Sequence, residues 1–561
     1  MHGAHTRAQA AEQQQLQHWS NKVGASSSMG NNRVKLVIGI ACACSFFYVL
    51  FLVLFSSSHP CFFWHMSCPT SSSSSFSACS KLAKTPTQKN KLKTSATTTA
   101  TELLHLVNRM DSALMALNDI PGGEGAAPAP NSIDLVGPRF KTDLSRIVFG
   151  IAAAADMWGA RKEYVRLWWK PEQKMRGFVW FDKMPSMKWS SDLPPYRVSE
   201  NTARFKYTYK RGWRSAIRIS RIVSESFRLG LPDVDWFVMG DDDTLFFPDN
   251  LVQVLSKYNH SKMFYIGNPS ESHLQNILFS YNMAYGGGGF AISYPLAKAL
   301  AKMQDACLER YPHLFGSDDR MHACMAEIGI LLTKEPGFHQ FDIHGDASGL
   351  LSAHPVAPLV SLHHLDLISP IFPNTQTINY TRMGALKHLM MATKIDPGSI
   401  LQQSICYDKR HHWSFSVSWG YSVQVHKGFI TPRELEIPIK TFTSWHRETS
   451  KVEFPFNTRD NPDDLCSRPM RFFMESVKAP TTNSGGLMQG IYVRENNGHA
   501  DKCGEKLLPL SVVEKIHIKR ELTDDSWYQL PRRSCCQIRR WESDKIEVHV
   551  GACQDGEILI V

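Results

Sequence analysis

The chain has 561 residues, of which 43% are hydrophobic and 20% are charged, and its formal net charge is +10. This composition is ordinary for a globular protein with a large core, and the length allows roughly three or four domain-sized units. The modest positive charge contains no long block of lysine and arginine, which argues against a nucleic-acid-binding protein.

The N-terminal part predicts a membrane anchor. Residues 1–35 are polar and read as a cytosolic tail, and residues 36–55 then form a run of twenty residues without a charge. That length matches the hydrocarbon core of a bilayer. Arg33 and Lys35 precede the run, so the positive-inside rule leaves the N-terminus in the cytosol. We expect a single-pass type II signal anchor, and a cleaved signal peptide is the alternative.

Composition divides the rest of the chain into three parts. Residues 56–145, with runs of serine and threonine and a Pro/Gly/Ala-rich stretch, are typical of a stem or linker. Residues 146–370 alternate between strand-like and helix-like patterns, which predicts an α/β domain. Residues 371–561 read as a β-rich accessory region, for which we expect a small β-sandwich. The chain has 13 cysteines, and the eight from Cys307 to Cys553 are compatible with four disulfides in a lumenal compartment.

Three consecutive aspartates mark the candidate site. Trp236–Met239 reads as a buried strand, and Asp241, Asp242 and Asp243 follow its end. In open α/β sheets, ligands bind at the carboxyl ends of strands. Three adjacent carboxylates repel one another, and Mg²⁺ or Mn²⁺ would offset that repulsion. The pattern therefore predicts a divalent metal site, with a solvated acidic loop as the alternative.

Two downstream stretches extend this site. The run Gly286–Gly289 is interpreted as a tight turn that shapes the floor of a pocket, rather than as a flexible loop. Asp318 and Asp319 follow Ser317, a good helix N-cap, and suit the first turn of a helix. Beyond this structural role, one of the two acids could serve as a general base. A histidine-rich stretch could complete a metal site: His339, His344, His354, His363 and His364.

The order of the motifs resembles the Fringe-like branch of the β-1,3-glycosyltransferases. The matching segments are the aspartates with Thr244, YIGNPS from Tyr265, GGGGFAIS from Gly286, GSDDRM from Gly316 and GFHQ from Gly337. The best match is to the plant group of Fringe-related proteins labelled as a domain of unknown function, in which a C-terminal region without a Fringe counterpart also follows.

This resemblance implies a GT-A-like nucleotide-sugar-binding domain in a type II Golgi membrane protein with a lumenal catalytic part. It further implies an inverting transferase that uses Mn²⁺, or another divalent metal, and a UDP-sugar donor. The sugar moved would be a hexose or N-acetylhexosamine, the acceptor a glycan or glycoconjugate hydroxyl, and the linkage of the β-1,3 type. The alternative is a catalytically silent, lectin-like or nucleotide-sugar-binding Golgi protein.

The resemblance also implies residue roles around the donor. Asp241 and Asp243 would hold the metal, while Asp242 or Asp241 would reach the ribose or a metal-bound water. Gly287 and Gly288 would approach the bound donor. A metal at this place would offset the charge that develops on a nucleoside diphosphate leaving group.

The catalytic base and the metal histidine follow from the same comparison. Asp319, or as second choice Asp318, takes the position of the base that removes the proton of the acceptor hydroxyl. His339 falls near the metal histidine, although the second histidine that Fringe has two residues later is Phe341 here. His363 is the alternative ligand.

Overall fold

The computed structural model describes residues 140–557, apart from residues 211, 374–379, 447–454, 543 and 555. The predicted cytosolic tail, the membrane span at residues 36–55 and nearly all of the stem lie outside the described residues. Among the helices of the described part, none is both long and apolar enough to cross a bilayer.

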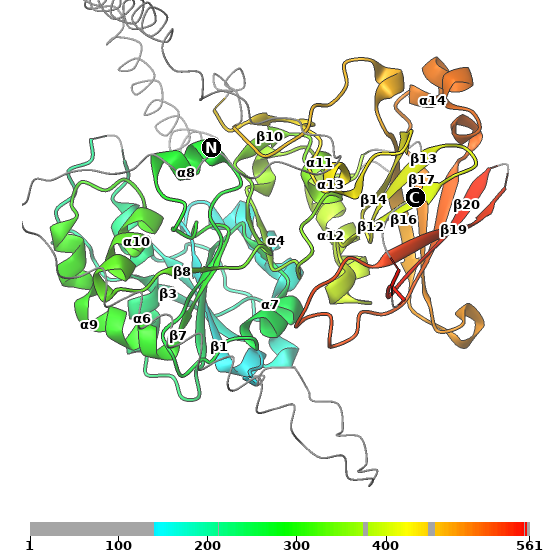
Figure 1. The fold of residues 1–561 in the computed structure, drawn as a ribbon. Helices are drawn as coiled ribbons and strands as arrows, with labels where there is room; N and C mark the ends of the chain where they lie inside the picture. The colour runs from blue at the N-terminus through cyan, green and yellow to red at the C-terminus, as the bar shows by residue number, and fades with distance from the viewer. Residues whose placement is uncertain are drawn as a thin grey trace, which may run out of the picture. The chain divides into compact units, whose positions relative to one another are not determined.

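A seven-stranded sheet forms the centre of the α/β part (Figure 1), with the strand order β3-β2-β1-β4-β7-β6-β8. Strands β1 to β4 run parallel, β6 and β8 are parallel to each other, and β7 is antiparallel to both of its neighbours. The prediction of a mixed α/β domain is confirmed. The strands are β1 (Ile147–Ala152), β2 (Arg176–Phe181), β3 (Tyr196–Val198), β4 (Trp236–Asp241), β6 (Tyr265–Gly267), β7 (Phe290–Ser293) and β8 (Leu332–Lys334).

Both faces of this sheet are buried, which explains why its strands are almost continuously apolar. In β1, Ile147, Phe149 and Ile151 belong to one hydrophobic cluster, whereas Val148 and Ala152 belong to another. Successive side chains of a strand point to opposite faces, so each face has its own core.

Helices cover the two faces separately. The face of Val148 is packed by α6 (Ile222–Arg228), α9 (Tyr294–Arg310) and α10 (Ser317–Ile328). The opposite face is packed by α4 (Trp158–Trp168) and α7 (Pro248–Leu255). The helices that the sequence pattern predicts at residues 161–169, 250–258, 295–311 and 317–328 match α4, α7, α9 and α10 to within a few residues.

Two local expectations were wrong. The apolar spacing of residues 211–229 predicts a single helix with Trp213 on its buried face. The structure instead has two helices there, α5 (Ser215–Ser220) and α6, and Trp213 is 48% exposed. The N-cap of α10 is Gly316, whereas the hydroxyl of Ser317 donates to Oδ1 of Asp318 at 3.0 Å. A helix can begin one residue earlier than its strongest capping residue when glycine supplies the extended backbone.

A small second sheet, ordered β5-β11-β9, lies beside the end of β4. Its strands are β5 (Leu245–Phe246), β9 (Phe338–Gln340) and β11 (Ser361–His363). Strands β9 and β11 are parallel and place Leu362 opposite His339 and His363 opposite Gln340. Because side chains alternate along a strand, these two pairs face opposite sides of the sheet. Between and around these strands lie α8 (His273–Leu278), α11 (Ser348–Ser352), and β10 (Ile343–Gly345) paired with β15 (Phe442–Ser444).

The C-terminal region is β-rich, as predicted, but the expected small sandwich is wrong. After α12 (Arg382–Thr393), eight strands form one sheet in the order β12-β13-β14-β16-β17-β18-β20-β19. Its two edge strands are joined by the disulfide Cys406–Cys536, so the sheet curls on itself instead of splitting into two layers. The strands are β12 (Gln403–Asp408), β13 (Trp413–Ser418), β14 (Ser422–Lys427), β16 (Met470–Lys478), β17 (Met488–Arg494), β18 (Lys515–Arg520), β19 (Cys535–Trp541) and β20 (Lys545–Gly551), with the short helices α13 (Pro432–Leu435) and α14 (His499–Cys503).

Four disulfides involve all eight cysteines from Cys307 to Cys553, which agrees with the expected even pairing. One joins α9 to α10, and the others tie the C-terminal region together. They are Cys307–Cys324, Cys406–Cys536, Cys466–Cys503 and Cys535–Cys553.

Candidate functional site

The aspartates sit at the carboxyl end of β4, where the sequence placed them. Thr244 fixes the loop that carries them: its Oγ1 accepts from the backbone N–H of Asp241 at 2.8 Å and donates to the carbonyl of Gly287 at 2.7 Å. The backbone N–H of Asp242 donates to the carbonyl of Ala152 at 3.0 Å. One threonine hydroxyl therefore ties the acidic loop to the glycine run.

The glycine run is a tight turn, as predicted, and its residues make close contacts that a side chain would block. A Cβ on Gly286 would lie 2.6 Å from Oδ1 of Asp318, and one on Gly287 would lie 2.1 Å from Cε1 of His363. Gly289 has a φ of +87°, in the region that favours glycine. The run thus lets two functional side chains approach the backbone.

His363 completes the acidic cluster. Its Nε2 lies 3.3 Å from Oδ1 of Asp243 and 3.8 Å from Oδ2 of Asp241. Its Nδ1 lies 2.9 Å from Oε1 of Gln340, whose amide nitrogen donates to Asp342 at 2.9 Å. Since an amide oxygen only accepts, Nδ1 carries a hydrogen. Nε2 faces the two carboxylates, to which it donates when protonated and beside which it offers a lone pair when the ring is neutral.

This donor set suits a divalent metal. One ligand atom from each of Asp241, Asp243 and His363 lies within 4.8 Å of the others. Two carboxylates and a neutral imidazole are ligands that Mn²⁺ accepts, and an imidazole oriented through its second nitrogen is typical of metal sites. The residues present therefore fit the predicted metal.

His339, the first choice for the metal histidine, lies elsewhere. It faces the opposite side of the small sheet from Gln340, where its Nδ1 contacts the Glu271 carboxylate and its Nε2 lies 2.9 Å from Nε2 of His354. The strand alternation explains this difference, because His339 pairs with Leu362 and not with His363. The alternative ligand His363 is the histidine that the structure brings to the aspartates.

Sequence reasoning missed Arg161, which is 5% exposed. Its guanidinium contacts the carboxylate of Asp243 and lies 3.5 Å from Asp242 and 3.1 Å from Asp366. Arg161 belongs to α4, and the only sequence signal was the position of that helix just after the first strand. Part of the charge compensation that we assigned to a metal alone is thus supplied by an arginine.

The three carboxylates differ in their proton affinity. Burial and the neighbouring charge of Asp243 raise the pKa of Asp241 to about 6. Burial also raises the pKa of Asp242 well above its ordinary value, although Arg161 opposes the shift. For Asp243, the charges of His363 and Arg161 outweigh burial and hold its pKa far below the usual range. Asp243 is therefore the firmly ionised member of the cluster.

The two acids at the start of α10 face different surroundings. Asp318 lines the same small cavity as Asp241 and Gly286, and burial together with the charge of Asp241 raises its pKa to about 6. Burial also raises the pKa of Asp319, whose surrounding charges come from His322, Arg320 and His313. The structure thus brings Asp318, the second choice for the base, next to the acidic cluster.

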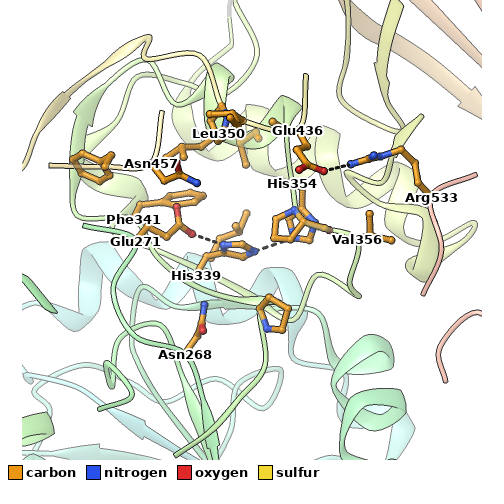
Figure 2. A pocket seen from close by; sticks show the side chains of 18 residues that line it. Asn268, Glu271, His339, Phe341, Leu350, His354, Val356, Glu436, Asn457 and Arg533 are labelled. Atoms are coloured by element: carbon orange, nitrogen blue, oxygen red, sulfur yellow. Dashed lines mark hydrogen bonds and ion pairs between the residues drawn. The ribbon is translucent and has the colours of Figure 1, made fainter. Parts of the chain in front are cut away.

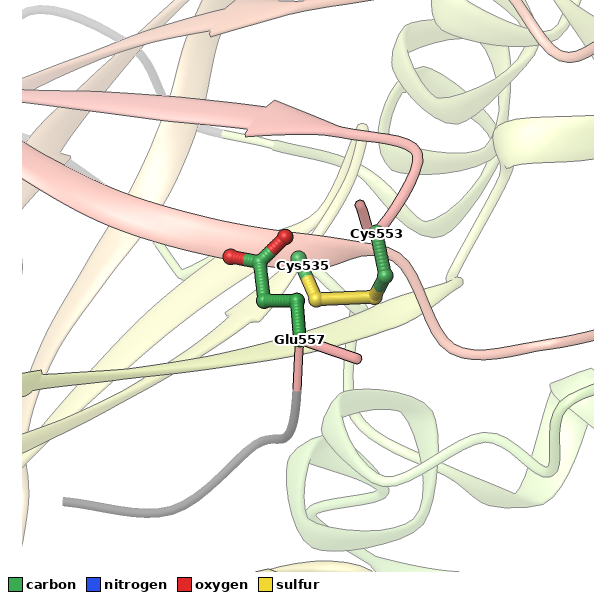
Figure 3. A group of neighbouring side chains, drawn as sticks. All are labelled: Cys535, Cys553 and Glu557. Atoms are coloured by element: carbon green, nitrogen blue, oxygen red, sulfur yellow. A yellow bond between two sulfur atoms is a disulfide. The ribbon is translucent and has the colours of Figure 1, made fainter. Parts of the chain in front are cut away.

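A second group of metal-ligand types among the described residues is not a metal site. Cys535, Cys553 and Glu557 lie together, but the two sulfurs form a disulfide (Figure 3). A disulfide has no thiolate to offer a metal.

Family comparisons confirm the resemblance seen in the motifs. Residues 161–348 match the model of the Fringe-like family. Residues 275–536 match the model of a protein family of unknown function, DUF604. The two matches overlap at the glycine run and α10 and together include the acidic loop and most of the C-terminal sheet.

Several solved glycosyltransferases show a distant likeness. The galactosyltransferase LgtC, in complex with donor and acceptor sugar analogues, is 15% identical over 36% of this chain and 74% of its own, with a TM-score of 0.24. A mannosyltransferase from Pyrobaculum calidifontis, in complex with GDP-Man and Mn²⁺, is 15% identical over 39% of this chain and 64% of its own, with a TM-score of 0.23. Mouse xyloside xylosyltransferase 1 is 8% identical over 34% of this chain and 85% of its own, with a TM-score of 0.22.

Proposed function

We propose, because residues 161–348 are Fringe-like, that this chain is a glycosyltransferase with a GT-A-like donor domain. It would move a hexose or N-acetylhexosamine from a UDP-sugar to a glycan or glycoconjugate hydroxyl, with inversion and in a β-1,3 linkage. The observation that carries the proposal is the grouping of Asp241, Asp243 and His363 at the carboxyl end of β4. In open α/β sheets this edge is where ligands bind.

The chain's own residues would divide the work at the donor. Asp241, Asp243 and His363 would hold a Mn²⁺ ion, which when bound supplies a positive charge against the diphosphate of the leaving group. Gln340 keeps the Nε2 lone pair of His363 directed at this place. Gly287 permits the close approach of the imidazole, since any larger residue would displace it.

Asp318 is the residue that we propose as general base. It lines one cavity with Asp241 and Gly286, and its raised pKa, about 6, lies close to neutrality. A carboxylate with a pKa near the working pH can accept the proton of an acceptor hydroxyl as the bond to the sugar forms, and such a base contributes on the order of 10²–10⁴ in rate.

Arg161 favours a second candidate function. Its guanidinium already neutralises part of the acidic cluster, as a substitute for a metal would. A protein that binds a nucleotide sugar without transferring it needs no catalytic metal, so this neutralisation by the arginine is enough. The two candidates differ in turnover and in the effect of Mn²⁺.

One experiment separates them. The full-length chain is incubated with a panel of UDP-sugars, with and without Mn²⁺, while thermal stability and release of UDP are recorded. Stabilisation by one UDP-sugar together with Mn²⁺-dependent release of UDP supports the transferase, and Asp243→Asn should then abolish both signals. Stabilisation with no release in the presence of candidate acceptors supports the binding protein. A folded chain that responds to no UDP-sugar contradicts both.

We further propose that this part of the chain works in the Golgi lumen behind the predicted membrane anchor. The four disulfides support an oxidising compartment, since disulfides are rare in the cytosol. Protease treatment of intact microsomes provides the test: a C-terminal tag should be protected until the membrane is opened with detergent. A tag that is digested in intact vesicles contradicts this placement.

A further inference from the structure

A cavity of about 470 Å³ lies on the side of the small sheet that faces away from the aspartates. His339 and Leu362 line it, whereas their strand neighbour His363 faces Asp243 and Gln340 contacts His363. Residues from other parts of the chain complete its wall, among them Glu271, His354, Glu436, Asn457 and Arg533 (Figure 2).

Two histidines in this cavity point their Nε2 atoms at each other. The distance between Nε2 of His339 and Nε2 of His354 is 2.9 Å, and both side chains are buried. Figure 2 shows the row formed by Glu271, His339 and His354. Neither imidazole takes part in the donor site described above.

The outer partners of these histidines fix their tautomers. Nδ1 of His354 lies 2.7 Å from the carbonyl oxygen of Pro355, which can only accept, so this Nδ1 carries the hydrogen. Nδ1 of His339 contacts the carboxylate of Glu271, which is likewise an acceptor. Both hydrogens therefore point outward, and both Nε2 lone pairs point at each other. Two lone pairs at this distance repel unless a cation joins the two nitrogens, which can be a proton on one ring or a metal ion bound by both.

We propose that His339 and His354 are ligands of a second metal site, which holds a divalent transition-metal ion of the Zn²⁺ and Co²⁺ class. Imidazole nitrogen is a preferred ligand of these ions. The remaining coordination positions of the ion open into the cavity.

Two features favour a metal over a proton shared by the two rings. Metal-binding histidines characteristically donate their second N–H to a carboxylate or a backbone carbonyl, and Glu271 and Pro355 provide one of each. Two nitrogens bound at roughly 2.1 Å to one ion are separated by about 3.4 Å at a tetrahedral angle and by about 3.0 Å at an angle near 90°. The observed separation of 2.9 Å is close to the smaller value, so a small rotation of either ring would let both nitrogens bind one ion.

The surroundings leave room for further ligands. Glu436 is engaged by Arg533 at 3.3 Å, and the amide nitrogen of Asn268 donates to the carbonyl of Phe338 at 3.2 Å. These groups line the cavity without closing it, so water or an oxygen atom of a small molecule can occupy the open positions. Open positions are typical of metal sites that bind or activate a ligand, whereas structural sites are closed by four protein ligands.

The test uses the full-length chain with His363→Gln, in which the donor site has lost its histidine. The protein is stripped with a chelator, supplied with excess Mg²⁺ and titrated with Co²⁺, whose visible absorption reports nitrogen ligands. We expect one equivalent of Co²⁺ to bind and Zn²⁺ to displace it. X-ray absorption of the Zn²⁺ form should show two imidazoles at about 2.0–2.1 Å. A folded chain that binds neither ion overturns the proposal.

Two variants test whether the bound ion is held by the proposed residues. His354→Gln should weaken Co²⁺ binding at least tenfold, and Glu271→Gln should weaken it about 10–100-fold, since it removes only the orienting carboxylate. Equal Co²⁺ affinity in a folded His354→Gln chain would also overturn the proposal. If that variant does not fold, the count of imidazoles by X-ray absorption decides alone. None of these measurements uses a nucleotide sugar, so their outcome is independent of the proposed transferase activity.

Discussion

The Nε2 atom of His363 lies 3.3 Å from Oδ1 of Asp243, although the two residues come from distant parts of the chain. Gln340 accepts the hydrogen of the other ring nitrogen, so Nε2 faces a firmly ionised carboxylate and can carry either a proton or a metal ion there. Either cation offsets the charge of Asp243, and Arg161 supplies a further positive charge from the other side of this carboxylate. The relationship defines which histidine belongs to the donor site.

The first prediction concerns that histidine. His363→Gln should reduce Mn²⁺-dependent binding of UDP by at least about tenfold, because one of three protein ligands is lost. Titration calorimetry with UDP, with and without Mn²⁺, measures the effect. His339→Gln provides the comparison and should leave UDP binding unchanged, since its imidazole faces Glu271 and His354. If Mn²⁺-dependent UDP binding were weakened in His339→Gln and unchanged in His363→Gln, His339 would be the donor-site ligand.

The glycine run offers a second prediction. Gly287→Ala places a methyl group 2.1 Å from the present position of Cε1 of His363, which is far closer than two carbon atoms can approach. The imidazole must move, so Mn²⁺-dependent UDP binding should be lost while the disulfide-linked fold persists. Gly504→Ala is the control, because its Cβ would meet no atom within 4 Å and the residue has no place in the donor site. Equal UDP affinity in both variants would contradict the tight contact.

Arg161 leads to a third prediction. Removing one partner of a buried ion pair leaves an uncompensated charge and costs about 3–5 kcal/mol. Arg161→Met should therefore lower the free energy of unfolding by about that amount in the absence of metal, and Mn²⁺ should recover part of the loss. Urea unfolding with and without Mn²⁺ measures both effects.

Arg166 on the same helix is the control for this experiment. It pairs with Glu163 and Asp192 near the surface, where such pairs contribute less than about 1 kcal/mol. Arg166→Met should thus have a small effect that Mn²⁺ does not change. If Arg161→Met lowers the free energy of unfolding by no more than Arg166→Met does, the stability of the acidic cluster does not depend on its arginine.

Much of the α/β part could be predicted from the sequence, because its signals are local. The apolar run Trp236–Met239 and the alternation of strand and helix patterns placed the sheet and the aspartates correctly. The glycine run was interpreted correctly because four consecutive glycines next to apolar residues are costly unless the backbone needs them.

Other features depend on contacts that no local pattern contains. The choice between His339 and His363 is decided by which residues pair across β9 and β11, a register that spacing does not reveal. Arg161 looks like any basic residue of an amphipathic helix until the helix is placed beside the strand end. The single curled C-terminal sheet follows from long-range pairing, including the parallel contact of β18 with β20.

The two acids of α10 give a fourth prediction. Asp318→Asn should retain UDP binding and lose transfer by about 10²–10⁴, the usual contribution of a general base. Asp319→Asn should retain most of the transfer rate, because the charged neighbours of Asp319 include His322 and Arg320 and not Asp241. Turnover with the donor and acceptor identified by the panel measures both. A loss confined to Asp319→Asn would support the assignment that the Fringe resemblance implies.

A fifth prediction uses a buried carboxyl far from the donor site. Burial raises the pKa of Glu225 to about 7, although Arg221 lies 3.0 Å away and opposes the shift. The folded state therefore binds this proton more tightly than the unfolded state, whose pKa lies near 4.5. This proton stabilises the folded state fully below the unfolded-state pKa of 4.5. The stabilisation, at most about 3 kcal/mol, is lost as the pH rises from there through the folded-state pKa of about 7.

Glu225→Gln tests this directly, because the neutral amide keeps the shape and cannot titrate. The free energy of unfolding, measured in urea between about pH 4.5 and pH 7.5, should fall less steeply with pH in the variant than in the wild type. Glu200 contacts the same arginine from a more exposed position, and its pKa is lowered mainly by its hydrogen bond to Arg221. Because the charge of Glu200 also raises the pKa of Glu225, Glu200→Gln should keep a fall across this window but make it smaller. Identical pH profiles for wild type and Glu225→Gln would mean that Arg221 keeps the buried carboxyl ionised throughout.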